Sequence, residues 1–129
     1  MITIGLTGGI GSGKTSIARM FEELGIPIYI ADTEAKQLMH TSSVIKEELI
    51  ALLGEEIYKD GELDRPYMAS LIFNDKALLE QVNKIVHPRV GEHFIAWRDY
   101  QNTAYCIKEN AILFENGSYK DCDYSILVV

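Results

Sequence analysis

Eight residues near the start of the chain have the residue types and spacing of a phosphate-binding loop. Gly8 and Gly13 enclose four residues and are followed by Lys14 and Thr15, which matches the pattern G-x-x-x-x-G-K-[ST] in full. Glycines let successive backbone amides point at one anion, and a helix opening there adds its positive end. The lysine can reach the β- and γ-phosphates, and the threonine hydroxyl suits Mg²⁺. The pattern predicts nucleotide binding.

A strand and a helix are expected on either side of this loop. Residues 2–6 (ITIGL) are apolar and β-branched, which is typical of a buried parallel strand. From Ile17 onward, apolar residues recur on one face of a helix, and Gly25 and Pro27 end it. A second apolar run at residues 26–31 completes a βαβ unit, whose crossover should be right-handed.

The remainder of the chain alternates helical and strand patterns. We expect helices at residues 33–40 and 43–53, a turn at 59–61, a helix start at 64–66 and a later helix that His87-Pro88 kinks or interrupts. Residues 104–107 and 124–129 have the composition of strands. The prediction is one α/β domain over residues 1–129, a P-loop NTPase-type parallel sheet flanked by helices, with a helical insertion at about 33–98.

Composition narrows the class of protein. The formal net charge of −7 argues against a nucleic-acid-binding surface, which would be basic. The apolar runs are too short to span a membrane, and the first residues lack the basic and apolar regions of a signal peptide. We therefore expect no membrane and no nucleic acid as partner, and a cytoplasmic location.

Other nucleotide-binding classes need motifs that this sequence lacks. A GTPase reads guanine with Asn-Lys-x-Asp, and the near match that begins at Asn83-Lys84 has no Asp. Neither Asp-x-x-Gly, which a GTPase needs, nor the Ser-Gly-Gly signature of transporter ATPases occurs in the chain. A small-molecule kinase with a helical insertion over its acceptor fits better.

The sequence resembles the dephospho-CoA kinases. The opening GLTGGIGSGKT at residues 5–15 is similar to the start of that family, and further ordered matches cover essentially the whole chain. They are Gly25-Ile26-Pro27, Ala31-Asp32, Gly61-Glu62-Leu63-Asp64-Arg65, Ile85-Val86-His87-Pro88 and Ile112-Leu113-Phe114-Glu115. The resemblance implies an ATP- and Mg²⁺-dependent kinase of coenzyme A biosynthesis. Such a kinase transfers the γ-phosphoryl group of ATP to the ribose 3′-hydroxyl of dephospho-CoA.

The resemblance also implies roles for particular residues. Asp32 would act beside the acceptor ribose as general base or outer Mg²⁺ partner, or it is only a helix N-cap. Arg65 would pair with an acceptor phosphate, or it is a surface arginine. ATP phosphates would be bound by Gly11, Ser12, Gly13, Lys14, Thr15 and Ser16, with Lys14 catalytic and Thr15 the metal ligand.

Three further residues have two interpretations each. His87 could contact the acceptor, although His-Pro is also a helix-breaking corner. Glu115 could close the site or cap a turn. Glu109 follows the strand at 104–107 in a Walker-B-like place, where it could hold a Mg²⁺-bound water.

The chain departs from the family pattern at two points. Ile30 stands where the family often has an aspartate before Ala-Asp, and family members are longer, with an arginine-bearing lid, a further strand and helices. No arginine follows Arg98 here, and positioned cations are important in phosphoryl transfer. We therefore expect the N-terminal part of such a kinase, poorly active alone. An uncovered strand at residues 124–129 would favour self-association.

Two alternatives remain at this point. The chain could belong to a P-loop kinase of another small acceptor, such as a nucleoside. It could also be a non-catalytic nucleotide-binding fragment.

Overall fold

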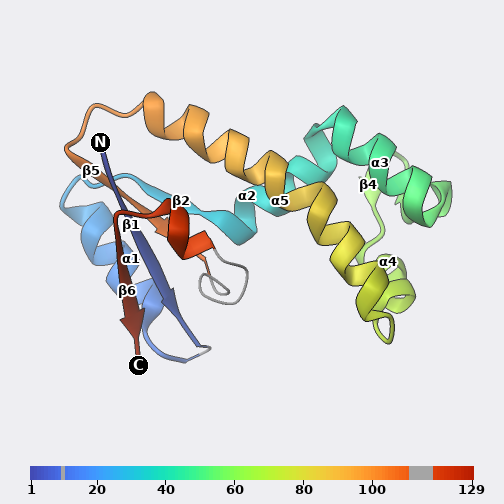
Figure 1. The fold of residues 1–129 in the computed structure, drawn as a ribbon, viewed down its shortest axis with the longest axis horizontal. Helices are drawn as coiled ribbons and strands as arrows, with labels where there is room; N and C mark the ends of the chain where they lie inside the picture. Colours follow the sequence, from blue (N-terminus) through green and yellow to red (C-terminus); the bar gives the residue numbers. More distant parts are fainter. Residues whose placement is uncertain (10, 111–117) are drawn as a thin grey trace. The chain divides into compact units, whose positions relative to one another are not determined.

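The computed structural model describes residues 1–9, 11–110 and 118–129. The described chain divides into two compact units. The first combines Met1–Thr33 with Phe94–Val129, and the second is Glu34–His93. Figure 1 traces both units along the chain.

A parallel sheet of four strands forms the centre of the first unit. The strands are β1 (Ile2–Gly8), β2 (Ile28–Ile30), β5 (Tyr105–Glu109) and β6 (Tyr124–Val128), in the spatial order β2-β5-β1-β6 (Figure 1). Every neighbouring pair is parallel. The predicted parallel sheet is therefore confirmed, and its carboxyl ends meet at one edge.

Helix α1 (Lys14–Glu23) covers one face of this sheet. Leu6, Ala18 and Ile107 form the buried centre of the contact and are at most 5% exposed. The helix ends as expected at Gly25, which adopts a left-handed φ of 84° and donates its amide to the Glu22 carbonyl. Burial of this apolar face fixes the start of α1 next to the end of β1.

The opposite face of the sheet carries an aromatic cluster. Tyr29 from β2 contacts Phe94 and Trp97 of helix α5 (Lys76–Asp99), with ring centroids 5.0 and 5.3 Å away. The buried Lys108 places its ammonium group 4.7 Å from the centroid of the Phe94 ring. A cation over an aromatic face is favourable, especially where water is excluded. The cluster therefore stabilises a buried lysine on β5.

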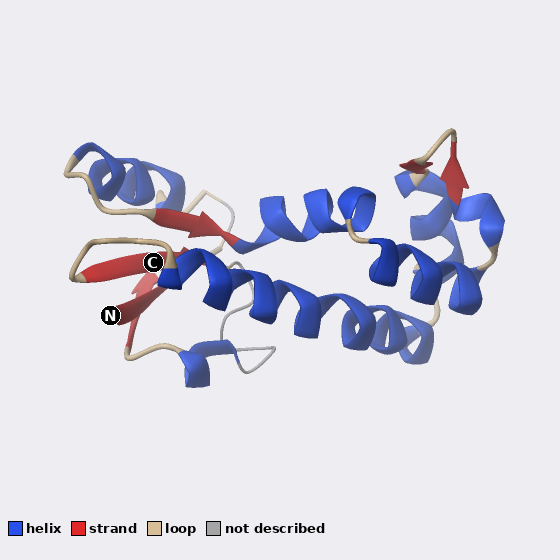
Figure 2. Cartoon of the chain, turned by 90° about the horizontal axis from the view of Figure 1, so that it is seen from above, coloured by secondary structure: helices blue, strands red, loops and turns tan. Residues whose placement is uncertain are grey.

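The second unit consists mainly of helices. They are α3 (Ser43–Leu53) and α4 (Arg65–Ile72), together with most of α2 (Ala31–Thr41) and α5. A two-stranded hairpin, β3 (Tyr58–Lys59) and β4 (Glu62–Leu63), lies next to α3 and α4 in both views (Figures 1 and 2). The hairpin was not predicted.

Local sequence signals explain where these elements begin and turn. The hydroxyl of Ser42 accepts the Ile45 amide at the start of α3, and the Asp64 carboxylate accepts the Tyr67 amide at the start of α4. Asp60 and Gly61 both have positive φ, 53° and 82°, as a two-residue hairpin turn requires. The predicted turn and helix start are therefore confirmed.

The predicted bounds of one strand were wrong, and of the two outcomes predicted for His87-Pro88, a kink or an interruption, the interruption did not occur. The strand expected at residues 26–31 covers only Ile28–Ile30, because α2 begins at Ala31. Helix α5 is not interrupted at His87-Pro88, since it is one helix with Pro88 inside it. A buried apolar stripe continues across the proline and compensates for the lost backbone hydrogen bond. The stripe consists of Val82, Val86, Val90 and Phe94.

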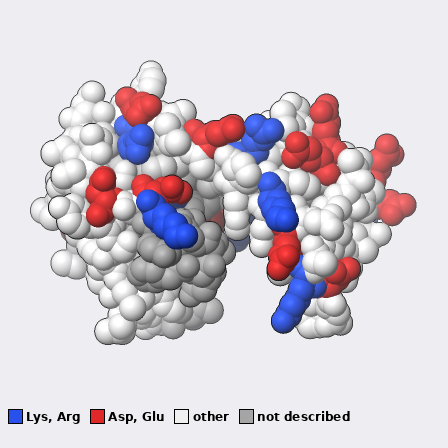
Figure 3. Space-filling view, in the orientation of Figure 1, with Lys and Arg blue, Asp and Glu red and all other residues white. Residues whose placement is uncertain are grey.

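Charges of both signs are mixed on the surface. On the face shown in Figure 3, basic side chains lie beside acidic ones in each unit. Of the helices in the described ranges, none combines the length and the apolar character needed to cross a membrane.

Candidate functional site

The glycine loop between β1 and α1 contains two residues with left-handed backbone. Gly11 has a φ of 80° and Gly13 a φ of 91°, a region that side chains with a Cβ rarely adopt. The Gly13 carbonyl accepts the amide of Ile17 at 3.1 Å. The first amides of α1 therefore have no acceptor within the helix. These amides and the positive end of the helix favour an anion in front of them.

Gly8 is the glycine that close packing requires. A Cβ at this position would lie 2.6 Å from Oγ of Ser12 and 2.8 Å from the carbonyl oxygen of Val128. Both distances are shorter than van der Waals contact permits. The Ser12 hydroxyl is itself buried and has no hydrogen-bond partner among the described residues. The loop is thus folded tightly against the end of β6.

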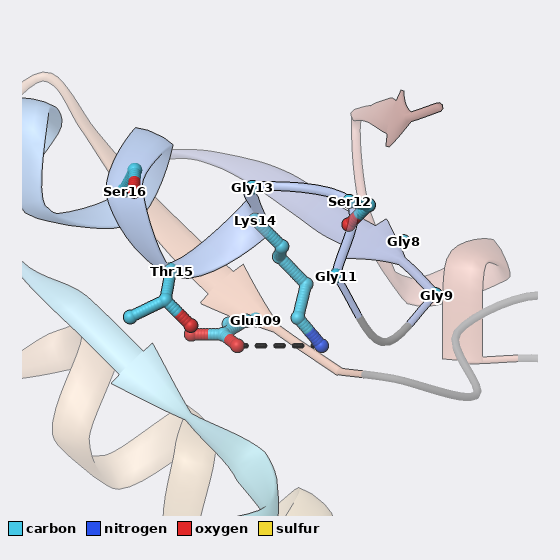
Figure 4. Close-up of a pocket in the computed structure, with 9 residues that line it drawn as sticks. All are labelled: Gly8, Gly9, Gly11, Ser12, Gly13, Lys14, Thr15, Ser16 and Glu109. Atoms are coloured by element: carbon cyan, nitrogen blue, oxygen red, sulfur yellow. Dashed lines mark ion pairs between the residues drawn. The ribbon is translucent and has the colours of Figure 1, made fainter.

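Lys14 and Glu109 face each other across a pocket formed by the loop. The pocket has a volume of about 620 Å³ and is lined by the loop and by Glu109 (Figure 4). Nζ of Lys14 lies 3.4 Å from Oε1 of Glu109, and their side chains are only 14% and 11% exposed. Lys14, predicted to bind phosphates, therefore lines the pocket. It is paired with the carboxylate of Glu109, the residue at the Walker-B-like position at the end of β5.

The other predicted loop residues line the same pocket. They are Gly11, Ser12, Gly13, Thr15 and Ser16. The Thr15 hydroxyl and the Glu109 carboxylate supply oxygen donors, which Mg²⁺ prefers over nitrogen and sulfur. These two side chains therefore fit a Mg²⁺ ion bound together with phosphates.

Asp32 lies near the same edge of the sheet. Its side chain is exposed. Because Asp32 is the second residue of α2, it does not occupy the N-cap position, which precedes the first helical residue. Ile30, two residues earlier, pairs with Glu109 in the sheet. Because the carboxyl ends of parallel strands share an edge, Asp32 follows β2 on the edge that bears the glycine loop.

Arg65 belongs to the second unit, where it lies against α2. One Nη atom is 3.4 Å from the Lys36 carbonyl oxygen and 3.5 Å from Nε2 of His40. Within the described ranges Arg65 forms no ion pair. Burial raises the pKa of the nearby Tyr58, and the positive charge of Arg65 opposes that shift. Within the described part of the chain, the Arg65 guanidinium thus contacts a carbonyl oxygen and a histidine ring and no carboxylate.

His40 is a neighbour of Arg65 that the sequence did not single out. The Leu63 amide donates to Nδ1 of His40 at 3.4 Å. Nε2 of the same ring lies 3.5 Å from an Nη atom of Arg65. A helical histidine whose partners lie more than twenty residues away gives no local signal in the sequence.

Two predicted candidates remain, His87 and Glu115. His87 is exposed within α5 in the second unit. Glu115 lies outside the described residues.

The fold and the loop together define the class of this protein. A parallel sheet whose central strand leads through a glycine loop, lysine and threonine into a helix is the arrangement of P-loop nucleotide-binding proteins.

The chain belongs to the dephospho-CoA kinase family, whose sequence model matches residues 2–129. It is 46% identical over 128 residues to the dephospho-CoA kinase of Porphyromonas gingivalis, covering 99% of this chain and 63% of that protein. It is 41% identical over 128 residues to a dephospho-CoA kinase of Bacteroides fragilis, covering 98% of this chain and 62% of the relative. The chain thus spans less than two thirds of these relatives.

Solved structures share the fold. The crystal structure of TT1252 from Thermus thermophilus superimposes with a TM-score of 0.87 at 31% identity and covers 99% of this chain and 65% of its own. The dephospho-CoA kinase from Campylobacter jejuni has a TM-score of 0.76 at 21% identity, covering 97% of this chain and 64% of its own. The predicted fold class is therefore confirmed.

Proposed function

We propose that the protein containing this chain phosphorylates the ribose 3′-hydroxyl of dephospho-CoA with ATP and produces coenzyme A. The supporting observation is the family match over residues 2–129, combined with a complete glycine loop that lines a pocket with Lys14 and Thr15. Similar proteins of two genera bear the name of this activity.

The loop would bind the phosphates of ATP. The amides of residues 11–16 point to this role because glycine conformations and a helix start create an anion site there. Lys14 would hold the terminal phosphates and stabilise the charge that spreads over the transferred group. Mg²⁺, held by the phosphates, Thr15 and Glu109, would supply further positive charge at the same place.

The acceptor would be bound and activated by residues after β2. Asp32 is proposed as the general base that receives the proton of the attacking hydroxyl, because it follows β2 at the edge bearing the loop. Arg65 is proposed to bind an acceptor phosphate, because its guanidinium lacks an ion pair among the described residues. His87 and Glu115 are proposed as further acceptor contacts on the resemblance alone.

Residues 1–129 by themselves are proposed to be poorly active. They span 63% of the relative from P. gingivalis, and Arg98 is their last arginine. One additional arginine can contribute roughly 10³–10⁵-fold to phosphoryl transfer.

Small-molecule substrates in the cytoplasm are proposed as the partners of the protein, with no membrane and no nucleic acid among them. Self-association is proposed to occur through the exposed side chains of β6.

An acceptor screen tests the proposed activity. The protein is incubated with Mg-ATP and either dephospho-CoA or a panel of nucleosides, and ADP formation is followed together with the mass of the product. We expect dephospho-CoA to gain one phosphoryl group and to be preferred over every nucleoside. Preference for a nucleoside would replace this function with that of another small-molecule kinase.

A matched pair of lysine variants checks that the loop performs the reaction. Lys14→Met should lower kcat/KM by about a hundredfold or more, because it removes a cation from the transferred phosphate. Lys84→Met changes an exposed lysine of α5 and should leave the rate unchanged. Equal rates for the two variants would contradict the assignment of Lys14.

A further inference from the structure

The lysine that would bind phosphate is already paired with a carboxylate. Lys14 lies 3.4 Å from Glu109, and both side chains are largely buried in the loop pocket. Withdrawing either partner from such a pair leaves a poorly solvated charge, which is costly. Lys14 therefore has to exchange one anion for another when phosphates enter.

Glu109 cannot easily move away during that exchange. It ends β5, and its backbone is flanked by Leu6 of β1 on one side and Ile30 of β2 on the other. The residue is 8% exposed. The main chain therefore keeps the carboxylate near the centre of the sheet edge, beside the place where the loop amides would bind more negative charge. Like charges repel, and more strongly where side chains are largely shielded from water, as Lys14 and Glu109 are.

We propose that Glu109 is a positioning residue that holds Lys14 in the ligand-free pocket and makes nucleotide binding dependent on a divalent cation. This inference rests on the proposed function. Phosphates without a cation compete with Glu109 for Lys14 and are repelled by its carboxylate. Phosphates that arrive with Mg²⁺ bring positive charge, which the carboxylate attracts, so Lys14 is released to the phosphates.

Substitution of Glu109 by glutamine separates this role from a purely structural one. The affinity for ATP is measured by calorimetry once with Mg²⁺ and once with EDTA. Glu109→Gln should bind ATP in EDTA about tenfold or more tightly than the unchanged protein, because one fixed negative charge is removed. Its affinity for Mg-ATP should change less, so the ratio of the two affinities falls.

The control is Glu23→Gln, which removes the same charge from the exposed last turn of α1. It should leave both affinities unchanged. Equal or weaker binding by Glu109→Gln in EDTA would overturn the inference while leaving the proposed function intact. Failure of the unchanged protein to bind Mg-ATP would instead overturn the proposed function.

A second variant covers the case in which Glu109→Gln does not fold, as judged by circular dichroism and thermal unfolding. Glu109→Asp keeps the charge but shortens the side chain, which withdraws the carboxylate from Lys14. We expect Glu109→Asp to raise the affinity for ATP in EDTA, but by less than Glu109→Gln does. No rise for a folded Glu109→Asp variant would then overturn the inference.

Discussion

At the scale of single residues, Gly8 is the loop position with the least space for a side chain. Gly8→Ala would push a Cβ to 2.6 Å from Ser12 Oγ and 2.8 Å from the Val128 carbonyl oxygen. We expect the free energy of unfolding to fall by about 1–3 kcal/mol, as overpacking typically costs, and nucleotide affinity to fall with it. Urea denaturation and calorimetry with Mg-ATP measure both quantities.

Gly9→Ala is the matched control for this prediction. Among the described residues, no atom lies within 4 Å of a Cβ added at Gly9, and this glycine has no left-handed backbone. The control should therefore lose much less stability than Gly8→Ala. Equal losses for the two variants would show that loop flexibility, and not contact with Ser12 and Val128, makes Gly8 necessary.

The carboxylate of Asp64 makes the second unit sensitive to acid. Its pKa is lowered, first by the hydrogen bond from the Tyr67 amide and then by Lys59. A lowered pKa stabilises the folded state above the ordinary pKa near 3.8, and this contribution is lost as the pH falls through the folded-state pKa. The unchanged protein should therefore exceed Asp64→Asn in stability by a larger margin at pH 7 than at pH 2.5.

Urea denaturation at both pH values measures this difference, and asparagine is suitable because it also caps helices. Asp75→Asn is the comparison, since Asp75 likewise accepts an amide at a helix start, from Leu78, but forms no ion pair in the described ranges. If Asp64→Asn changed the free energy of unfolding equally at both pH values, a lowered pKa of Asp64 in the folded protein would be contradicted.

Sequence patterns were most informative for residues whose role is local. The loop from Gly11 to Ser16 and the cap at Asp64 follow from spacing alone, because their partners lie within a few residues. The ion pair of Lys14 with Glu109 depends on the pairing of β1 with β5, which joins residues about a hundred positions apart. The contact of His40 with Arg65 has the same origin in tertiary structure.

At the scale of elements, α5 shows how packing overrides a local signal. Pro88 removes one backbone hydrogen bond inside this helix, yet the helix continues from Lys76 to Asp99. Pro88→Ala should therefore raise the free energy of unfolding, by at most the roughly 3 kcal/mol that an interior proline costs. Thermal and urea unfolding check the change.

Pro66 provides the comparison for Pro88. It lies in the first turn of α4, where a missing amide hydrogen costs nothing. Pro66→Ala should change stability little. A loss of stability in Pro88→Ala would show that the surrounding side chains are packed around a bend that the proline imposes.

Element boundaries could be predicted where a cap or a glycine marks them. Helix α3 matches its expected range of 43–53, with Ser42 at its start and Gly54 after its end. The hairpin β3–β4 was missed because strands of two residues are too short to show alternation. Only their turn at Asp60-Gly61 has a sequence signature.

At the scale of the whole molecule, β6, one of the two edge strands of the described sheet, exposes apolar side chains. Within the described sheet β6 pairs only with β1, and Tyr124 and Leu127 are 65% and 57% exposed. Such an edge tends to associate with another chain. We expect light scattering of residues 1–129 to show a mass that rises with concentration.

A lysine on the edge strand should prevent this association. Leu127→Lys introduces a charge that disfavours edge pairing. Leu24→Lys makes the same exchange at an exposed position after α1 and should leave the association unchanged. A monomer at all concentrations, or an equal effect of both variants, would contradict a role for β6.

The contact of β6 with the glycine loop makes residue 129 a useful place for a reporter group. Val129 is fully exposed, while the preceding Val128 touches the backbone at Gly8. Closely packed interiors transmit small displacements. A fluorophore attached at residue 129 would therefore sense a nucleotide entering the loop while remaining outside the pocket, giving an optical titration of occupancy.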